Sequence, residues 1–430
     1  MTRAVSVALA IALLGSNASV DSFRLLPADD ALLEDLSRRT FMFFWEQADP
    51  QTGIIRDRAR TDGSPPDERA RAIGSIASVG FGLAGMCIAA ERGWLPRATV
   101  VDRVRTTLRF FAERQGQEHG WFYHFINFHT GAREWNSELS SIDTALLMAG
   151  VLTVRRCFGN DRSIAGYAER LYRRLDFQWM LAGHPTLLAH GWKPESGFLH
   201  ARWDHYCELM ILYLLGIGSP THPIPAASWR EWSRPAMSFG QYRYVSGPDP
   251  LFVHQYSHAW IDFRGRAEQG TGIDWFENSV MATRAHKAFC LSLAAEFPGY
   301  GDNTWGITAS DSRKGYVAWG GPPRDPNIDG TVVPTAAGGS LMFTPDISLP
   351  ALRTMHERFG QRVYGQYGFV DAFNPNTGWV DPDVIGINVG PILLSAENMR
   401  TENVWRWFMR NAEIPRALRR AGLRRGVMRA

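Results

Sequence analysis

The acidic and aromatic run that starts at Trp203 is the segment of the chain best suited to chemistry. It reads "WDHYCELMILYLLGIGSPTHP", and a helix over 204–216 would set Asp204 and Glu208 one turn apart. Packing beside apolar groups raises the pKa of a carboxyl group, as a general acid requires. Glu208 is therefore a candidate proton donor. The alternative is that Asp204 caps the helix and Glu208 forms a buried hydrogen bond.

A second acidic and aromatic stretch surrounds Asp371. It reads "YGQYGFVDAFNPNTGW" and places Tyr367, Phe373 and Asn374 close to that carboxyl group in the sequence. Aromatic rings can stack on sugar faces, and cleavage of a glycosidic bond needs a proton donor and a second carboxylate. The two stretches together indicate a carbohydrate-active site, although Asp371 is equally compatible with a role in stabilising a turn.

Glu138 and Asp143 are further acidic candidates, in "EWNSELSSIDTALL". On a regular helix they would point about 140° apart, so both can face one ligand only if the first turn is irregular. Acidic residues at a helix start also favour the helix dipole, which is the simpler account. Either carboxylate could still bind sugar hydroxyls.

His254 and His258 lie four residues apart in "HQYSHAWIDFRG". This spacing suits a metal ion only on a helix, whereas the following residues are typical of a loop, so we expect hydrogen bonds to substrate or protein and no metal. His124 and the pair Asp57 and Arg58 could border the same groove, but isolated residues of these types are more often structural.

Composition limits the classes of function. The 430 residues carry a net charge of only +3, which argues against a nucleic-acid partner. No P-loop, H-E-x-x-H or G-x-S-x-G motif is present in the sequence. The 16 Trp favour a groove that binds ring-shaped ligands. The separated cysteines, Cys87, Cys157, Cys207 and Cys290, predict buried free thiols, with one disulfide as the alternative.

The two ends of the chain differ from its body. Residues 1–22 resemble a secretory signal peptide, since their apolar run of about 11 residues is too short to span a bilayer. We therefore expect a periplasmic or secreted protein without stable membrane insertion, and a monomer. The Arg-rich tail, 412–430, is expected to be a frayed, solvated end.

Apolar residues recur at helical spacing along most of the chain, which predicts a mainly α fold. The expected helices are 31–47, 75–92, 98–114, 137–156, 164–180, 204–216, 275–296, 349–359 and 391–410. Two stretches rich in Gly, Pro and aromatic residues, 219–273 and 300–345, are expected to be long functional loops. Paired helices with elaborate loops favour an α/α toroid, because no repeat of fixed length supports a solenoid.

Several phrases in this order resemble one family. They are "SIASVGFGLAG", "SSIDTALLMAG", "LLGIGSPTHP", "HQYSHAWIDFRG", "WFENSVMATRA", "WGITASD", "DGTVVPTAAGGSL", "YGFVDAFN" and "GPILLSAENMR". The chain from 30 to 411 is similar to the bacterial glucoamylase-like glycosidases that include endo-β-1,2-glucanases. The resemblance implies a single (α/α)6 toroid that hydrolyses β-1,2-linked glucan by inversion, without a metal or other cofactor.

The same resemblance implies roles for individual residues. Glu208 becomes the general acid and Asp371 the general base acting through water, with proton transfer through bridging groups. Glucan subsites are expected from Glu138, Asp143, Trp203, Tyr206, His254, Tyr256, His258, Tyr367, Phe373 and Asn374. Relatives tend to have Gln where this chain has Val389, which leaves linkage preference open.

Three alternatives to this hydrolase remain at this stage. A transglycosylase that remodels cyclic β-glucan would use the same donor chemistry but exclude water. A noncatalytic glycan-binding protein would capture oligosaccharide without cutting it. An α-glucan hydrolase fits less well, and the sequence does not separate endo from exo action.

Overall fold

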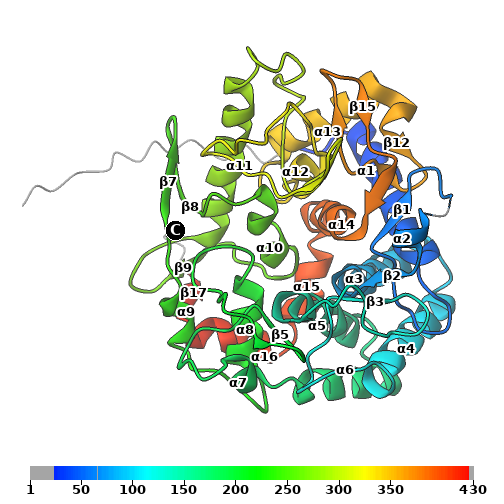
Figure 1. Ribbon diagram of the computed structural model, residues 1–430, viewed down its shortest axis with the longest axis vertical. Helices are drawn as coiled ribbons and strands as arrows, with labels where there is room; N and C mark the ends of the chain where they lie inside the picture. The colour runs from blue at the N-terminus through cyan, green and yellow to red at the C-terminus, as the bar shows by residue number, and fades with distance from the viewer. Residues whose placement is uncertain (1–23, 65, 426–430) are drawn as a thin grey trace, which may run out of the picture.

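The computed structural model describes residues 24–64 and 66–425 (Figure 1). Helices provide most of its regular structure and each strand has only two to four residues, so the prediction of a mainly α fold is confirmed. The signal peptide predicted over 1–22 lies outside the described residues. The helices are α1 (Pro27–Glu46), α2 (Glu68–Arg71), α3 (Ile76–Arg92), α4 (Arg97–Glu113), α5 (Ser141–Cys157), α6 (Arg162–Arg174), α7 (Phe177–Met180), α8 (Met210–Gly218), α9 (Ser228–Glu231), α10 (Tyr256–Trp260), α11 (Trp275–Ser292), α12 (Pro334–Gly338), α13 (Pro345–Phe359), α14 (Gly386–Thr401), α15 (Asn403–Met409) and α16 (Glu413–Arg420), with 3-10 turns η1 (Leu251–His254) and η2 (Gly360–Arg362).

The strands form small antiparallel sheets between these helices. They are β1 (Arg58–Arg60), β2 (Ile73–Ser75), β3 (Phe125–Asn127), β4 (Leu139–Ser140), β5 (Gly191–Lys193), β6 (Gly197–Phe198), β7 (Ala236–Phe239), β8 (Tyr242–Val245), β9 (Arg266–Glu268), β10 (Ser310–Ser312), β11 (Gly315–Val317), β12 (Tyr364–Gly365), β13 (Gly368–Phe369), β14 (Phe373–Asn374), β15 (Trp379–Val380), β16 (Asp383–Ile385) and β17 (Leu423–Arg425). Two pairings join distant parts of the chain, β1 with β16 and β9 with β17.

Contacts between helices close into a ring. From α3 the contacts run to α5, then to α8, α10 and α14, and α14 packs against α3 again. Other helices lie outside this ring: α4 and α6 against α3 and α5, α16 against α8, and α1 against α14. The short helix α12 contacts both α14 of the ring and α13. Figure 1 shows α3, α5 and α14 near the middle, with α1, α4, α6 and α13 around them. From α1 to α8 the longer helices thus alternate along the chain between outer and inner positions.

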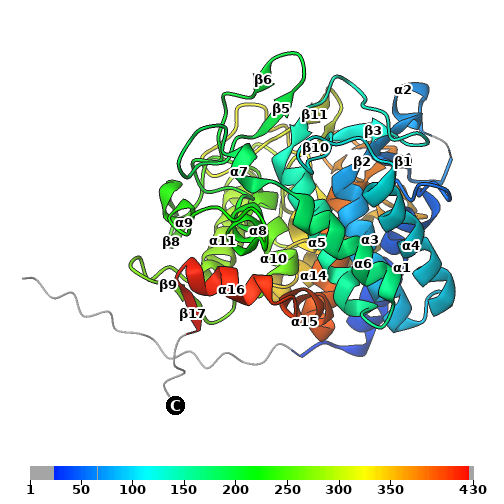
Figure 2. The ribbon, with the colours of Figure 1, turned by 90° about the horizontal axis from the view of Figure 1, so that it is seen from below.

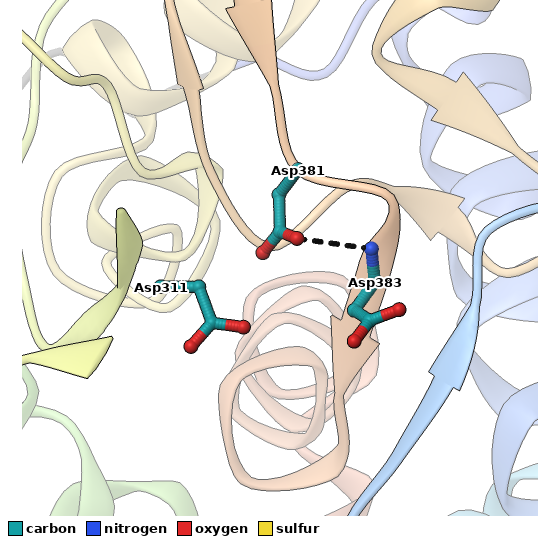
Figure 3. Close-up of side chains that lie close together, drawn as sticks. All are labelled: Asp311, Asp381 and Asp383. Carbon is teal, nitrogen blue, oxygen red and sulfur yellow. Dashed lines mark hydrogen bonds between the residues drawn. The ribbon is translucent and has the colours of Figure 1, made fainter. Parts of the chain in front are cut away.

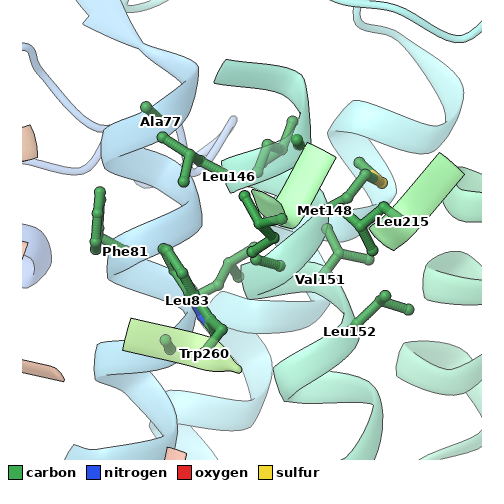
Figure 4. Close-up of a cluster of buried hydrophobic side chains, with 14 of the residues drawn as sticks. Ala77, Phe81, Leu83, Leu146, Met148, Val151, Leu152, Leu215 and Trp260 are labelled. Carbon is green, nitrogen blue, oxygen red and sulfur yellow. The ribbon is translucent and has the colours of Figure 1, made fainter. Parts of the chain in front are cut away.

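The tightest contact in the ring is the crossing of α3 and α5. A Cβ atom at Gly80 would lie 2.3 Å from the carbonyl oxygen of Leu146, and one at Gly150 would lie 2.2 Å from the carbonyl oxygen of Gly80. Because neither glycine carries a side chain, the two backbones can touch. Around the crossing, the core of Figure 4 includes Ala77, Phe81 and Leu83 of α3, Leu146, Met148, Val151 and Leu152 of α5, Leu215 of α8 and Trp260 of α10.

Short strands fix where the two crossing helices begin. β2 pairs with β3 and leads into α3, whose N-cap Ser75 accepts a hydrogen bond from the Ser78 N–H. β4 pairs with β5 and leads into α5, whose N-cap Ser140 accepts from the Asp143 N–H. Figure 2 shows β2, β3, β10 and β11 at one end of the helices and α15 and α16 at the opposite end. The N-termini of α3 and α5 therefore lie at the strand-bearing end.

The helix predicted over 204–216 is wrong in its first half, since α8 begins only at Met210. The Ser233 N–H donates to the Asp204 carbonyl and the Tyr206 N–H donates to the Ser233 carbonyl, at 2.7 and 2.9 Å. These backbone groups are engaged across the chain, so they are unavailable to an α-helix. Asp204 and Glu208 consequently do not share a helical face.

The two stretches expected to be long loops contain short elements of their own. Residues 219–273 include α9, the β7–β8 hairpin, η1, α10 and β9, and residues 300–345 include the β10–β11 hairpin and α12. The two stretches are therefore mainly irregular, as expected, and no element that lies wholly within them exceeds five residues.

The expectation of a frayed, solvated C-terminal end is also wrong for the part of the tail that the structure describes. Ile414, Ala417 and Leu418 are fully buried on one face of α16, which packs against α8. Arg416 and Arg420 also donate hydrogen bonds to the carbonyl groups of Gly218 and Ile217 at the end of α8. The expectation of a solvated end rested on the number of arginines and overlooked the amphipathic pattern of α16.

All four cysteines are free thiols, as predicted, although Cys157 is only partly buried. Among the helices described at 24–64 and 66–425, none combines the length and apolarity needed to cross a bilayer.

We predict that Leu418→Ala lowers the free energy of unfolding by about 2–5 kcal/mol, because it opens a cavity between α16 and α8. Urea denaturation followed by circular dichroism would measure the change. Arg419→Ala, on the exposed face of the same helix, should stay within about 0.5 kcal/mol of the wild type. Equal, small effects of both substitutions would mean that α16 does not contribute to the core.

Candidate active site

Glu208 lies in the turn that leads into α8, and its backbone is fixed by α10. The Ser257 hydroxyl donates to the Glu208 carbonyl at 2.8 Å and accepts from the Ile211 N–H at 3.0 Å. Burial raises the pKa of the Glu208 carboxyl to about 7, and nearby Asp249 and Asp143 add to the shift. Glu208 is therefore a carboxyl group that can carry a proton at neutral pH.

Asp371 lies between β13 and β14 and is only 2% exposed. Its Oδ1 accepts a 2.6 Å hydrogen bond from the Asn388 amide, and its Oδ2 accepts one of 2.8 Å from the Asp311 N–H. Burial raises the pKa of Asp371 to about 7, although these two donors and Arg58 oppose the rise. The two donors also fix the orientation of the carboxyl group. Residues distant in the sequence therefore hold Asp371, in addition to its own turn.

Arg58 joins the carboxylates next to Asp371. Its guanidinium lies 2.6 Å from Asp311 Oδ2, 3.3 Å from Asp57 Oδ2 and 3.6 Å from Asp383 Oδ2. Burial alone would lower the pKa of Arg58, but Asp57, Asp311 and Asp383 raise it. The pairing of β1 with β16 brings Arg58 to Asp383, although the two are far apart in the sequence.

Three carboxyl groups beside Arg58 meet the spacing of a cation site. One oxygen each of Asp311, Asp381 and Asp383 lies within 4.8 Å of the others (Figure 3). Arg58 and Arg60 already pair with Asp311 and Asp383, so guanidinium groups supply part of the positive charge. Asp381 differs, because its Oδ2 is buried and has no hydrogen-bond partner among the described residues. Burial raises its pKa to about 8, with help from Asp371 and Asp311. A proton on Asp381 thus relieves the remaining repulsion.

His124 connects the two other acidic candidates. Its Nδ1 lies 3.1 Å from Glu138 Oε1 and its Nε2 lies 3.5 Å from Asp143 Oδ1. Glu138 precedes α5, because residues 139–140 pair with β5, so the helical-wheel separation of Glu138 and Asp143 does not apply. Burial alone would lower the pKa of His124, but Asp143, Glu138 and Asp57 raise it to about 9. The imidazolium in turn lowers the pKa of Glu138, against the effect of burial.

Tyr256 is a buried side chain in the neighbourhood of the two main carboxyl groups. Burial raises its pKa, and among its electrostatic neighbours are Glu208, Asp143 and Asp371. Its hydroxyl donates to the Ile387 carbonyl at the start of α14. The structure therefore brings Glu208, Asp143 and Asp371 to one part of the molecule, at the N-terminal ends of α8, α5 and α14.

Most of the aromatic residues expected at sugar subsites are buried. Trp203 donates to the Ser141 hydroxyl at 2.8 Å, and Tyr206 stacks on Trp275 with ring centroids 5.3 Å apart. Tyr367 and Phe373 are 1% exposed, so their rings pack inside the protein. Asn374, also buried, donates to the carbonyl of Asp329 at 3.0 Å, a contact within the protein.

The exposed aromatic rings lie at positions that the sequence did not single out. Trp135 is 55% exposed and Tyr316 is 51% exposed. Trp135 packs on Phe125, which stacks on His124, and its backbone has a positive φ of 53°. Tyr316, on β11, has Asp371 among its electrostatic neighbours. One exposed ring therefore stands near each group of acids.

His254 and His258 are buried and bonded to the protein. His254 lies 2.9 Å from the Tyr206 hydroxyl and 3.1 Å from that of Ser246, and His258 lies 3.2 Å from that of Ser279. His258 belongs to α10 and His254 to η1, whereas residues 262–265 form a loop, as expected. Burial lowers the pKa of His254 to about 3, so it is a neutral hydrogen-bonding residue.

Comparison with known proteins gives the family. A family model described as "Putative glucoamylase" matches residues 200–412. A crystal structure from Bacteroides fragilis with the same description is 30% identical, with a TM-score of 0.85, and the match covers 96% of this chain and 100% of that chain. The chain belongs to this glucoamylase-like family.

Two further family relatives have named activities. The endo-β-1,2-glucanase of Chitinophaga pinensis, solved with sophorotriose and glucose, is 27% identical with a TM-score of 0.85, over 92% of this chain and 98% of that one. The exo-β-1,2-glucooligosaccharide sophorohydrolase of Parabacteroides distasonis is 28% identical over 91% of this chain. This chain spans 58% of that relative's length.

Val389 is the position at which this member of the glucoamylase-like family departs from the expected Gln. Its side chain is 2% exposed and belongs to the main hydrophobic core. The neighbouring Asn388 provides the amide that holds Asp371. In this chain, residue 389 therefore packs the start of α14.

We predict that His124 is an imidazolium at pH 7, whereas His254 is neutral. The His124 pair with Glu138 and Asp143 stabilises the fold below pH about 6.5, and this contribution is lost as the pH rises through about 9. Long-range ¹H–¹⁵N NMR would follow both rings in one titration, and Glu138→Gln should lower the pKa of His124. A wild-type His124 that titrates below pH 7 would show that these pairs do not form in solution.

Proposed function

We propose that this protein is a glycoside hydrolase that cleaves β-1,2-glucan into oligosaccharides with inversion at the anomeric carbon. The observation that carries the proposal is the pair of carboxyl groups, partly buried Glu208 and buried Asp371, whose pKa values are raised to about 7 and which are both electrostatic neighbours of Tyr256. The named activities of the two relatives favour β-1,2-glucan as the substrate class.

Glu208 suits the role of general acid. Burial of its carboxyl group and the negative charges of Asp249 and Asp143 disfavour its ionisation. A proton is therefore available on Glu208 near neutral pH for the leaving oxygen. Ser257 fixes the backbone of this residue, which limits where the carboxyl group can move.

Asp371 suits the role of general base. Hydrogen bonds from Asn388 and from the Asp311 N–H favour its charged form and leave further lone pairs of the carboxylate available. In the proposed step, Asp371 takes a proton from water while the water oxygen bonds to the anomeric carbon. The glycosidic C–O bond breaks, and the leaving oxygen takes the proton from Glu208. Bridging groups can relay either proton.

Subsites for the sugar chain are proposed around these two residues. Trp135 and Tyr316 offer exposed rings on which sugar faces can stack. Glu138 remains ionised beside His124, so its carboxylate can accept hydrogen bonds from sugar hydroxyls. Trp135 adopts a left-handed backbone conformation, which a non-glycine residue rarely holds without a functional or local reason.

We further propose that the ring of helices is an (α/α)6 toroid. Six inner helices would be α3, α5, α8, α10, α12 and α14, and their outer partners α4, α6, α16, α11, α13 and α1. The closed path of contacts from α3 through α5, α8, α10 and α14 supports this assignment.

The decisive experiment is product analysis after incubation of the purified protein with linear β-1,2-glucan. We expect short oligosaccharides whose new reducing ends first appear as the inverted anomer. NMR would follow the anomeric signals during the reaction. Linear α-1,4-glucan is the control and should remain intact. An untouched β-1,2-glucan that nevertheless binds the protein would overturn hydrolysis and favour the glycan-capture alternative.

We predict that Glu208→Gln and Asp371→Asn each lower kcat by several orders of magnitude, on the order of 10²–10⁴-fold or more. Each substitution removes a proton donor or acceptor but keeps the shape of the side chain. Asp204→Asn is the matched control, because Asp204 is exposed and pairs only with His205 among the described residues. Circular dichroism would check folding, and near-normal turnover of either active-site variant would remove that residue from its role.

A further inference from the structure

A cavity of about 630 Å³ lies at the opposite end of the helices from the candidate active site. Arg97, Arg156, Cys157, Phe158, Asp161 and Arg410 are among the residues that line it. α5 connects the two places, since Asp143 is in its first turn and Arg156 in its last. At a rise of 1.5 Å per residue, about 20 Å of helix separates them. The cavity is therefore distinct from the site at Glu208 and Asp371.

The three arginines of the cavity bring positive charge that no directly paired carboxylate offsets among the described residues. Across residues 24–64 and 66–425, none of Arg97, Arg156 and Arg410 has a carboxylate within 4.0 Å, although the adjacent Arg155 pairs with both Glu169 and Glu413. The one acidic residue of the lining, Asp161, is bound to Arg105 and caps α6. Burial and then the charge of Arg155 lower the pKa of Arg156, Arg410 adds to this shift, and the more distant Glu413 and Glu169 oppose it without cancelling it.

Helix dipoles account for only part of this arrangement. Arg156 and Arg410 lie at the C-terminal ends of α5 and α15, where a cation is favourable. Arg97 is the first residue of α4, at an N-terminal end where a cation is unfavourable. It is nevertheless held at the cavity, with its guanidinium 4.9 Å from the Phe158 ring centroid and a 3.3 Å hydrogen bond to the Cys157 carbonyl. A bound anion would offset this cost.

We propose that this cavity binds a phosphate group, either as inorganic phosphate or as part of a small organic phosphate. The planar fork of a guanidinium matches the oxygens of phosphate, and Arg97, Arg156 and Arg410 approach the cavity from three different helices or their ends. The volume exceeds the needs of one phosphate ion, which leaves room for an organic portion. A nucleic-acid backbone is disfavoured, because the three charges surround one cavity and do not follow a line.

The test is isothermal titration of the full-length protein with inorganic phosphate and with glucose 6-phosphate, at constant ionic strength set with chloride. We expect saturable binding of one phosphate group per chain. Arg97→Gln and Arg410→Gln should each weaken it by about tenfold or more, since each removes charge-assisted hydrogen bonds. Tighter binding of glucose 6-phosphate would assign the remaining volume to the organic portion, and equal binding would assign the site to phosphate alone.

The matched control is Arg109→Gln, which removes an exposed charge from α4 outside the cavity. It should change the dissociation constant by less than about twofold. Absence of saturable binding, or equal weakening by Arg109→Gln, would overturn the proposal. Turnover of β-1,2-glucan by Arg97→Gln should stay at the wild-type level, so the outcome does not depend on the function proposed for Glu208 and Asp371.

Discussion

The backbone contact between Gly80 of α3 and Gly150 of α5 is the constraint on which the rest of the site depends. A Cβ atom at either position would lie within 2.3 Å of a backbone oxygen, so a larger residue would force the helices apart. The N-cap residues of the two helices, Ser75 and Ser140, lie at the same end of the ring. A shift at the crossing would therefore move Asp143 relative to Asp57. Both carboxyl groups act on His124, so the shift would disturb the charged cluster around that residue.

Cations decide which of the clustered carboxyl groups keep their protons. Glu138 is paired with the His124 imidazolium, and the pKa of its carboxyl is lowered in spite of burial. Glu208 is buried near Asp249 and Asp143 instead, and its pKa rises. Asp371 lies between these cases, because Arg58 and two hydrogen-bond donors oppose the effect of burial. The same chemical group can thus act as ligand, acid or base according to its neighbours.

Sequence reasoning identified what depends on local pattern. Apolar periodicity predicted the long helices, and the surroundings of Glu208 and Asp371 marked both as candidates. It failed where distant backbone pairs decide the structure: Ser233 holds residues 204–206 out of a helix, and the pairing of β1 with β16 brings Arg58 to Asp383. Asp311, Asp381 and Asp383 carried no motif of their own, apart from the closely spaced acids after Trp379. These three carboxyl groups come together only in the folded protein, where β10, the end of β15 and β16 meet.

Tryptophan content shows why composition cannot separate a core from a binding surface. The excess of Trp suggested a groove lined by rings, yet Trp229, Trp260 and Trp305 are fully buried, as are several others. The same apolar area that stacks on a sugar also stabilises a large helical core, so the count fits both uses. The exposure of a ring, together with its backbone conformation, does distinguish a sugar-stacking residue from a core residue. Trp135 combines an exposed ring with a left-handed backbone beside the His124 cluster, which core packing does not require.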